Sequence, residues 1–138
     1  MQIRELDLKE LETAYDVLVQ LRNELSYQEF EDLIYDMRHM EYKMIGIFDK
    51  GKLLTYAGVA VQTNLYHKRH LYVFDLVTDV HFRGQGYGVM MLDYLLDYAK
   101  MGMCTSMVLS SGFAREDAHR FYEKDGFVKK SFVFVKTL

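Results

Sequence analysis

The residues best suited to chemistry lie in one glycine-spaced loop, Arg83–Gly88, with the sequence Arg-Gly-Gln-Gly-Tyr-Gly. Glycine at alternate positions lets the backbone approach a bound group closely and adopt positive φ. A helix that begins directly after such a loop offers unpaired amides and a partial positive charge, which suit a phosphate. The pattern therefore predicts an anion-binding loop, although an ordinary glycine-rich strand-to-helix turn has the same composition.

A strand before the loop and a helix after it must position these glycines, and the flanking residues predict both elements. Leu71–Thr78 is rich in apolar and β-branched residues, which favours a strand. The run from Val89 to Lys100 has helical spacing, and Gly102 is expected to end it. The apolar residues expected on its buried stripe are Val89, Leu92, Leu95, Leu96 and Ala99.

The N-terminal part of the chain predicts a strand followed by two helices. Met1–Leu6 favours the strand, and two capping-box pairs, Asp7 with Glu10 and Ser26 with Glu29, indicate where the helices begin. The residues expected to face the core are Leu11, Ala14, Tyr15, Leu18 and Leu21 in the first helix, and Phe30, Leu33, Ile34 and Met37 in the second.

The remaining elements predict a mixed α/β fold with an antiparallel first half and a parallel crossover at its centre. The expected segments are strands Tyr42–Phe48 and Leu53–Leu65, strand Cys104–Leu109, a helix from about Arg115 to Lys124, and two strand arms, Phe127–Val128 and Phe132–Val135. An apolar crossover strand beside its predecessor is usually parallel and buried on both faces. We therefore expect Cys104–Leu109 to be a central strand.

Composition indicates one folded domain, residues 1–138, of which half the residues are apolar. The net charge of −3 leaves only a short basic cluster, His67–His70, which is expected to be a solvated hairpin turn, so neither nucleic acid nor a membrane is indicated as a partner. The single cysteine, Cys104, allows no intramolecular disulfide and no cysteine-based metal cluster. We expect a buried thiol, a cytoplasmic location and no bound metal.

Two motifs resemble signatures of the GNAT superfamily of N-acetyltransferases, and the order of the elements is similar to the whole GNAT acyl-CoA N-acyltransferase fold. The loop Arg83–Gly88 matches the Q/R-x-x-G-x-G/A acyl-CoA signature. The segment Ala118–Phe127 resembles the second signature, A-x-x-x-Y-x-x-x-G-F, at the expected distance downstream. The resemblance covers essentially the full chain and points to a branch of small, single-domain bacterial GNAT proteins.

The resemblance implies acetyl-CoA as cofactor, with coenzyme A as the product, and residues that hold it. The loop residues implied to hold the pyrophosphate are Gly84, Gln85, Gly86, Tyr87 and Gly88. Arg83 would lie near the phosphates or be a solvated charge, and the backbone at Leu76, Val77 and Thr78 would pair with the pantetheine arm where two parallel strands splay apart. Arg115 replaces an asparagine that often contacts pantetheine in the family and could instead reach a CoA phosphate.

For catalysis, the resemblance implies that Tyr122 protonates the departing thiolate, although an aromatic residue packing the last helix would look the same. The general base stays open between His70, Asp75 and a water relay. His70 is expected to be a surface residue, and Asp75 is expected on the opposite sheet face, bonded to structural partners. His119 could serve substrate or solvent.

The reaction implied by the resemblance is direct acetyl transfer to a primary amine of a small molecule or protein. A non-catalytic acyl-CoA-binding sensor or regulatory module is the alternative, because no base is evident. A mixture of aromatic and acidic residues could bind a cationic amine, but the same residues are common where helices pack on a sheet. The candidates on the substrate side are Arg22, Glu24, Tyr27, Tyr35 and Tyr56. A homodimer through the C-terminal strands is left open, since no residue identifies one.

Overall fold

The computed structural model describes all 138 residues, and these form two compact units, Met1–Val108 (the sheet unit) and Leu109–Leu138 (the C-terminal unit). The elements of the sheet unit are β1 (Gln2–Glu5), α1 (Leu11–Leu18), α2 (Tyr27–Met37), β2 (Lys43–Asp49), β3 (Lys52–Asn64), β4 (Lys68–Thr78), α3 (Tyr87–Met101) and β5 (Ser106–Val108). The C-terminal unit contains one helix, α4 (Glu116–Lys124).

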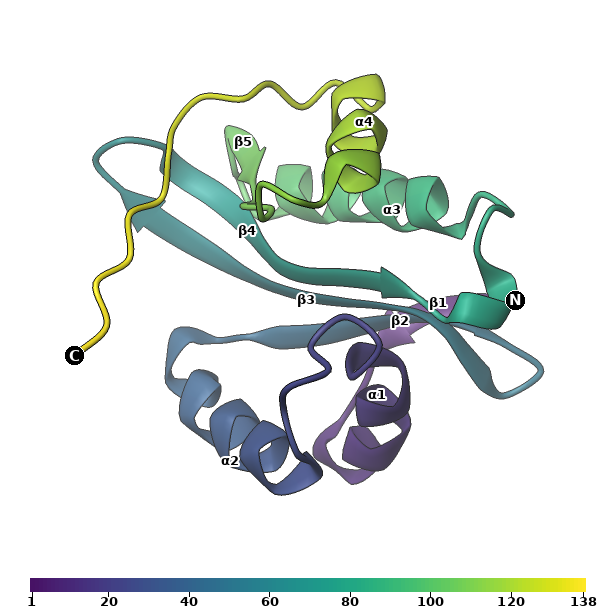
Figure 1. Ribbon diagram of the computed structural model, residues 1–138. Helices are drawn as coiled ribbons and strands as arrows, with labels where there is room; N and C mark the ends of the chain where they lie inside the picture. Colours follow the sequence, from purple (N-terminus) through teal and green to yellow (C-terminus); the bar gives the residue numbers. More distant parts are fainter. The chain divides into compact units, whose positions relative to one another are not determined.

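The sheet unit is a five-stranded sheet with helices on both faces, in the order β1-β2-β3-β4-β5 (Figure 1). Strands β1 to β4 are antiparallel neighbours, whereas β4 and β5 are parallel. Helices α1 and α2 cover one face, and the crossover helix α3 covers the other (Figure 1). The predicted mixed α/β fold, with an antiparallel first half and a parallel crossover, is confirmed.

Both predicted capping boxes are present at the starts of the N-terminal helical segments. The Asp7 side chain accepts from the Lys9 amide, and Glu10 accepts from the Asp7 amide. Ser26 and Glu29 form the same reciprocal pair at the start of α2. The buried face of both helices packs on the sheet, in a core that includes Leu11, Ala14, Leu18, Phe30, Ile34, Tyr56 and Val77.

Three residues predicted to face the core are exposed instead. Leu33 of α2, and Val89 and Leu96 of α3, are each between 44% and 45% exposed. In α3 the buried residues are Met91, Leu92, Leu95 and Ala99, and Val89 and Leu96 lie outside this arc. Helical periodicity predicts which side of a helix is apolar, but it does not determine which residues at the margin of that side are buried.

A β-bulge interrupts the pairing of β3 with β4. Gly58 pairs with Asp75 and the next residue, Val59, pairs with Val73, so Phe74 is an extra residue in β4. A bulge bends its strand and lets neighbouring side chains abandon strict alternation. This irregularity lies just before the segment Leu76–Thr78 that leads to the glycine loop.

Strand β5 differs from the expectation of a buried central strand. It is only three residues long, Ser106–Val108, and it forms the edge of the sheet. Ser106 is exposed, and Met107 and Val108 are half-buried. As the edge strand, β5 has a strand neighbour, β4, on one side only. Cys104, just before β5, is half-buried, and burial raises the pKa of its thiol.

In the C-terminal unit, α4 ends at Lys124 and Gly126 adopts a φ of 99°, as expected for the stop signal. The two expected strand arms, Phe127–Val128 and Phe132–Val135, are absent, since residues 127–138 form no helix or strand. Apolar alternation favours a strand only when another strand supplies backbone partners. The backbone hydrogen bonds of this unit lie within α4 and at its two ends.

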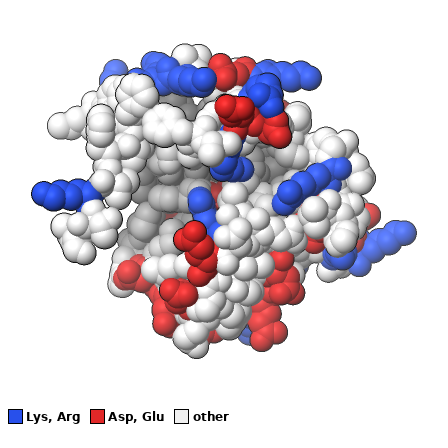
Figure 2. All heavy atoms as spheres, in the orientation of Figure 1, with Lys and Arg blue, Asp and Glu red and all other residues white.

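The surface carries charges of both signs. In Figure 2, Lys and Arg side chains are interspersed with Asp and Glu over the displayed face. No helix of the chain has the length and apolar content needed to cross a bilayer.

Candidate functional site

The glycine loop bends sharply and opens directly into α3. Gly84 and Gly86 have φ values of 75° and 88°, a region that costs L-residues energy because of their Cβ. Gly86 is the N-cap of α3 and has no side chain with which to cap the helix. The amides at the start of α3 are therefore left for another partner.

The backbone amides of the loop form a set of unpaired hydrogen-bond donors. The backbone amides of residues 84–89 donate to no group within the chain, and the Met90 amide is the first that bonds back, to the Gly86 carbonyl. A Cβ placed at Gly84 or Gly86 would meet nothing within 4 Å, so open space adjoins these amides. This arrangement has the donors and the room that a pyrophosphate requires.

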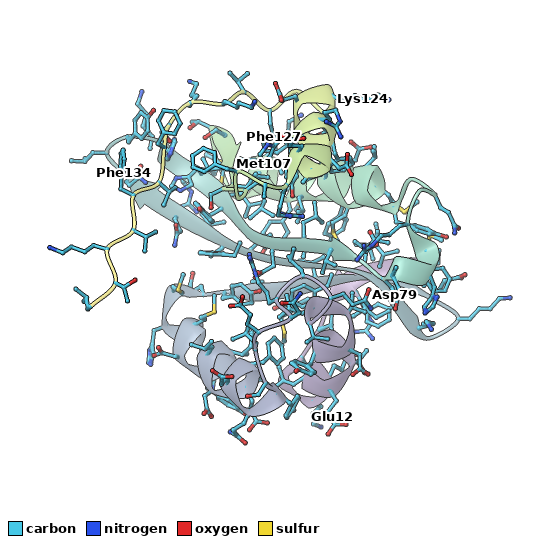
Figure 3. The ribbon with its side chains drawn as sticks, in the orientation of Figure 1. Glu12, Asp79, Met107, Lys124, Phe127 and Phe134 are labelled. Carbon is cyan, nitrogen blue, oxygen red and sulfur yellow. The ribbon has the colours of Figure 1, made fainter.

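Asp79 fixes the chain where β4 turns toward the loop (Figure 3). Its carboxylate accepts from the His81 amide at 2.9 Å, and its own amide donates to the Leu54 carbonyl at 2.8 Å. Hydrogen bonding from the His81 amide, and then from Gln20, lowers the pKa of the Asp79 carboxyl despite its burial. The Val80 amide also donates to Gln20 of the segment after α1, at 2.8 Å.

Arg83 lies at the head of the loop and is exposed. Its Nε donates to the Thr78 carbonyl at 2.8 Å, which ties the base of the guanidinium to the end of β4. The two outer nitrogens of the group make no hydrogen bond within the chain. Arg83 is thus held beside the loop with part of its charge available.

The edge of β4 is unpaired where the cofactor strand was expected. Strand β5 pairs only with His70, Leu71 and Tyr72. From Val73 to Thr78, β4 has a neighbour on the β3 side alone. The pairing of the two parallel strands therefore ends before Leu76, Val77 and Thr78, and these residues present a backbone edge to which an extended group could bind.

A partly buried polar network surrounds the bulge. The Arg22 Nε donates to Asp75 Oδ1 at 2.9 Å, and the Tyr42 hydroxyl donates to Asp75 Oδ2 at 2.7 Å. The Tyr56 hydroxyl lies 2.8 Å from the Tyr42 hydroxyl. Since Tyr42 gives its proton to the carboxylate, Tyr56 is the donor in that second bond. Burial raises the pKa values of Tyr42 and Tyr56, so both phenols stay protonated.

Asp75 has the structural partners that were expected, but its predicted position on the opposite face was wrong. Tyr42 contacts both Asp75, through its hydroxyl, and Phe74, with ring centroids 5.7 Å apart. The bulge at Phe74 breaks the period of two on which the prediction relied. Gly58, an isolated glycine within a β-rich run, was the available signal, since such a glycine often marks a bulge or close approach.

Gly58 also explains how Tyr42 reaches across the sheet. A Cβ at this position would overlap the Tyr42 hydroxyl and ring. The absence of a side chain at Gly58 therefore makes room for the bond from Tyr42 to Asp75. Sequence reasoning missed both Tyr42 and Gly58 as parts of this network.

The prediction that His70 is a surface residue was wrong, because its exposed fraction is 1%. Its Nδ1 lies 2.9 Å from the Lys68 carbonyl, which assigns the ring proton to Nδ1 and leaves Nε2 as an acceptor. Nε2 has no hydrogen-bond partner. The His70 ring lies between those of His67 and Tyr72, at 5.3 and 6.3 Å. The basic cluster itself forms the start of β4 and the preceding turn, as expected of a hairpin.

The substrate-side candidates do not converge on one site. Tyr27 packs against Tyr15, and Tyr56 is fully buried in the core. Glu24 and Tyr35 are exposed and point to no shared partner. Among these candidates, Arg22 donates side-chain hydrogen bonds directly to β4, to Asp75 and to the Phe74 carbonyl, to which its Nη2 donates at 2.9 Å.

The C-terminal unit holds the other predicted site residues. Tyr122 is 9% exposed, and the rings of Phe121 and Phe127 lie 5.4 and 5.6 Å from it. Arg115 immediately precedes α4 and its Nη1 lies 3.5 Å from the Ser111 hydroxyl. The His119 Nε2 lies 2.8 Å from the Gly112 carbonyl, so this ring is hydrogen-bonded to the loop before α4.

Comparison with known proteins matches this architecture to one family. The model of the acetyltransferase (GNAT) family matches residues 4–127. The chain is 33% identical over 125 residues to the uncharacterized N-acetyltransferase YhdJ of Bacillus subtilis (strain 168), covering 89% of this chain and 88% of that protein. It is 27% identical over 143 residues to the aminoalkylphosphonate N-acetyltransferase of Salmonella typhimurium (strain LT2), covering 99% and 91%.

The fold is also that of solved acetyltransferases. The ribosomal-protein-alanine N-acetyltransferase from Brucella melitensis biovar Abortus 2308 superimposes with a TM-score of 0.84, at 17% identity, over 100% of both chains. The five-stranded sheet with its parallel pair thus has a counterpart of known structure, and the family match spans the glycine loop and α4. This chain therefore belongs to the GNAT family of N-acetyltransferases.

Proposed function

We propose that the chain is a single GNAT domain, residues 1–138, that transfers an acetyl group from acetyl-CoA directly to a primary amine. The observation that carries this proposal is the unpaired donor set of residues 84–89 next to the unpaired edge of β4. The first suits a pyrophosphate, and the second suits an extended amide-containing arm. In the proposal, residues Gly84–Gly88 with Arg83 hold the phosphates, and the backbone of Leu76–Thr78 holds the pantetheine.

The bound cofactor supplies an acetyl thioester that a neutral amine can attack. In the overall transfer, a C–N bond forms, the C–S bond breaks, and the amine loses a proton. In the proposal, backbone amides of β4 that have no partner on the β5 side donate to the oxygen that gains charge during attack. Since both oxygens of Asp75 already accept bonds from Arg22 and Tyr42, and the Nε2 of His70 is buried, we assign the proton of the amine to solvent water.

Tyr122 is the proposed general acid. Its phenol can give a proton to the departing thiolate, which a phenylalanine could not do. In support, Tyr122 occupies the tyrosine position of the second signature and lies on α4, as that signature requires. Arg115, just before the same helix, is proposed to contact a CoA phosphate.

A small-molecule amine is the proposed acceptor. The Salmonella relative, which matches nearly the whole chain, is named for its action on aminoalkylphosphonates, and these are small amines. A cytoplasmic location is part of the proposal, because the single cysteine leaves no intramolecular disulfide to maintain. A homodimer and a protein acceptor remain alternatives within the same activity.

The test is acetyl-CoA turnover with a panel of primary amines, following thiol release and the mass of the acetylated amine. We expect both products with the native chain, and we expect Tyr122→Phe to lower kcat on the order of 10²-fold while acetyl-CoA still binds. Binding of acetyl-CoA without thiol release on any amine would instead support the alternative, an acyl-CoA-binding sensor or regulatory module. Acetylated lysines in a lysate, with no free amine modified, would point to a protein acceptor.

A further inference from the structure

Arg22 projects from the segment between α1 and α2 onto the bulge of β4. It donates through Nε to Asp75 Oδ1 at 2.9 Å and through Nη2 to the Phe74 carbonyl at 2.9 Å. Phe74 is the extra residue of the bulge, and the unpaired strand edge continues from it toward Thr78. Arg22 therefore lies at the end of the proposed pantetheine strand that is farther from the glycine loop.

One edge of the Arg22 guanidinium is used and the other is open. A guanidinium has five N–H donors, and the two bonds to Asp75 and Phe74 use the edge formed by Nε and Nη2. The edge formed by Nη1 and Nη2 makes no bond within the chain. The Arg22 side chain is 46% exposed, so a group from solvent can reach that edge. Two parallel N–H groups are the arrangement that binds carboxylate, phosphonate or phosphate in a bidentate manner.

The charges and rings near Arg22 favour an acceptor that carries both an amine and an anion. Asp75 is only 12% exposed and is paired with Arg22, so the pair is neutral as a whole. An acceptor with one charge of each sign leaves this half-buried site neutral, which lowers the cost of desolvation. The rings of Phe74 and Tyr72 lie 4.6 Å apart and are half-buried on the same stretch of β4. Their faces suit an ammonium group before it loses its proton.

We infer that Arg22 binds an oxyanion of the amine acceptor and selects acceptors in which a primary amine and a carboxylate, phosphonate or phosphate are a few atoms apart. This inference rests on the proposed acetyl transfer. Arg22 is a specificity-determining residue in this scheme, because its open edge holds the anion while its bonded edge stays on the bulge. Asp75 acts as a positioning residue, since it orients the guanidinium.

The test compares acceptors of equal chain length with the full-length protein. β-Alanine and 2-aminoethylphosphonate carry an anion, and ethanolamine carries a hydroxyl in the same place. We expect the native chain to have kcat/KM values about tenfold or more higher for the two anionic amines, mainly through KM. Arg22→Lys keeps a positive charge beside Asp75 but removes the planar fork. This variant should lower that preference by about tenfold, whereas Arg38→Lys, at the end of α2, should leave it unchanged.

A binding measurement separates this inference from the proposed function. Methylphosphonate, which has no amine, should inhibit competitively against the acceptor and raise the Tm of the native chain more than that of Arg22→Lys. Equal kcat/KM values for ethanolamine and the anionic amines would overturn the inference and leave acetyl transfer intact. If no amine is acetylated but methylphosphonate still binds through Arg22, the proposed function fails and the anion site stands. No turnover and no methylphosphonate binding would overturn both.

Discussion

At the scale of single residues, Tyr42 links the start of β2 to β3, through Tyr56, and to β4, through Asp75. Its hydroxyl accepts from Tyr56 and donates to Asp75, at 2.8 and 2.7 Å, and Gly58 leaves the space for it. Tyr56 has an exposed fraction of 0%, so water cannot replace Tyr42 as its partner. One of the two hydrogen bonds that hold the Asp75 carboxylate therefore comes from a buried phenol, and the other comes from Arg22.

We expect Tyr42→Phe to lower the free energy of unfolding by about 1–3 kcal/mol, because it leaves a buried hydroxyl of Tyr56 unpaired and removes a donor from Asp75. Urea denaturation at pH 7 measures the change. Tyr35→Phe is the matched control, since Tyr35 is 46% exposed and its loss should stay within about 0.5 kcal/mol. Equal losses in the two variants would contradict the network described for Tyr42.

At the scale of elements, the sequence predicted the features that depend on residues close to one another in the chain. The capping boxes at Asp7 and Ser26, the glycine loop and the start of α4 depend on residues a few positions apart, and the structure has them where the spacing placed them. The bulge at Phe74 depends on the register of two strands, which no period in one segment reveals. The wrong face for Asp75 follows from that register.

Burial was the other property that local patterns could not supply. His70 stands beside Lys68 and Arg69 in a basic run, yet its own side chain is buried. In a strand, successive side chains point to opposite faces, so the neighbours of a residue in sequence do not describe its surroundings. For the same reason, the short edge strand β5 could not be told from a central strand by its apolar residues alone.

We expect Gly86→Ala to lower the free energy of unfolding by about 1 kcal/mol, because Gly86 has a φ of 88° and a Cβ there would be strained although it meets no atom. The same Cβ would enter the space next to the loop amides and should weaken acetyl-CoA binding. Gly112→Ala is the matched control, since a Cβ there also meets nothing and its φ is ordinary. Denaturation and calorimetric titration of both variants check the prediction. A Gly86→Ala protein as stable as Gly112→Ala would contradict it.

Asp79 should give the turn into the loop a stability that depends on pH. Its pKa is lowered in the folded chain, by the His81 amide first, so the folded state favours the carboxylate. That contribution is complete above the pKa of the unfolded group, about 4, and is lost as pH falls through the lower folded value. Asp79→Ala should therefore cost about 1 kcal/mol at pH 7 and progressively less below pH 4.

Urea denaturation of the native and Asp79→Ala chains at several pH values between 7 and 3 measures this difference. Asp97→Ala, on the exposed side of α3, is the control and should show no pH-dependent difference of its own. A gap between the native chain and Asp79→Ala that stays constant to pH 3 would show that the charge of Asp79 does not contribute.

At the scale of the whole molecule, the chain consists of two compact units of unequal size, and each contains residues that are proposed to act in acetyl transfer. The glycine loop, the unpaired edge of β4 and Arg22 belong to the sheet unit, and Tyr122 and Arg115 belong to the C-terminal unit. The sheet unit holds most of the buried core, whereas α4 has Tyr122 as its buried residue. A ligand that binds the folded chain stabilises it by mass action, whichever unit it contacts.

We expect acetyl-CoA and CoA to raise the Tm of the chain, because binding only to the folded state at 100 times Kd adds about 2.7 kcal/mol. ADP carries a pyrophosphate that can reach the amides of residues 84–89, so it should give a smaller rise. Adenosine lacks the phosphates and should give almost none. Thermal unfolding followed by circular dichroism, with each ligand at the same concentration, measures the order. If adenosine matched ADP, the base and not the loop would account for binding, and the anion site at the start of α3 would be wrong.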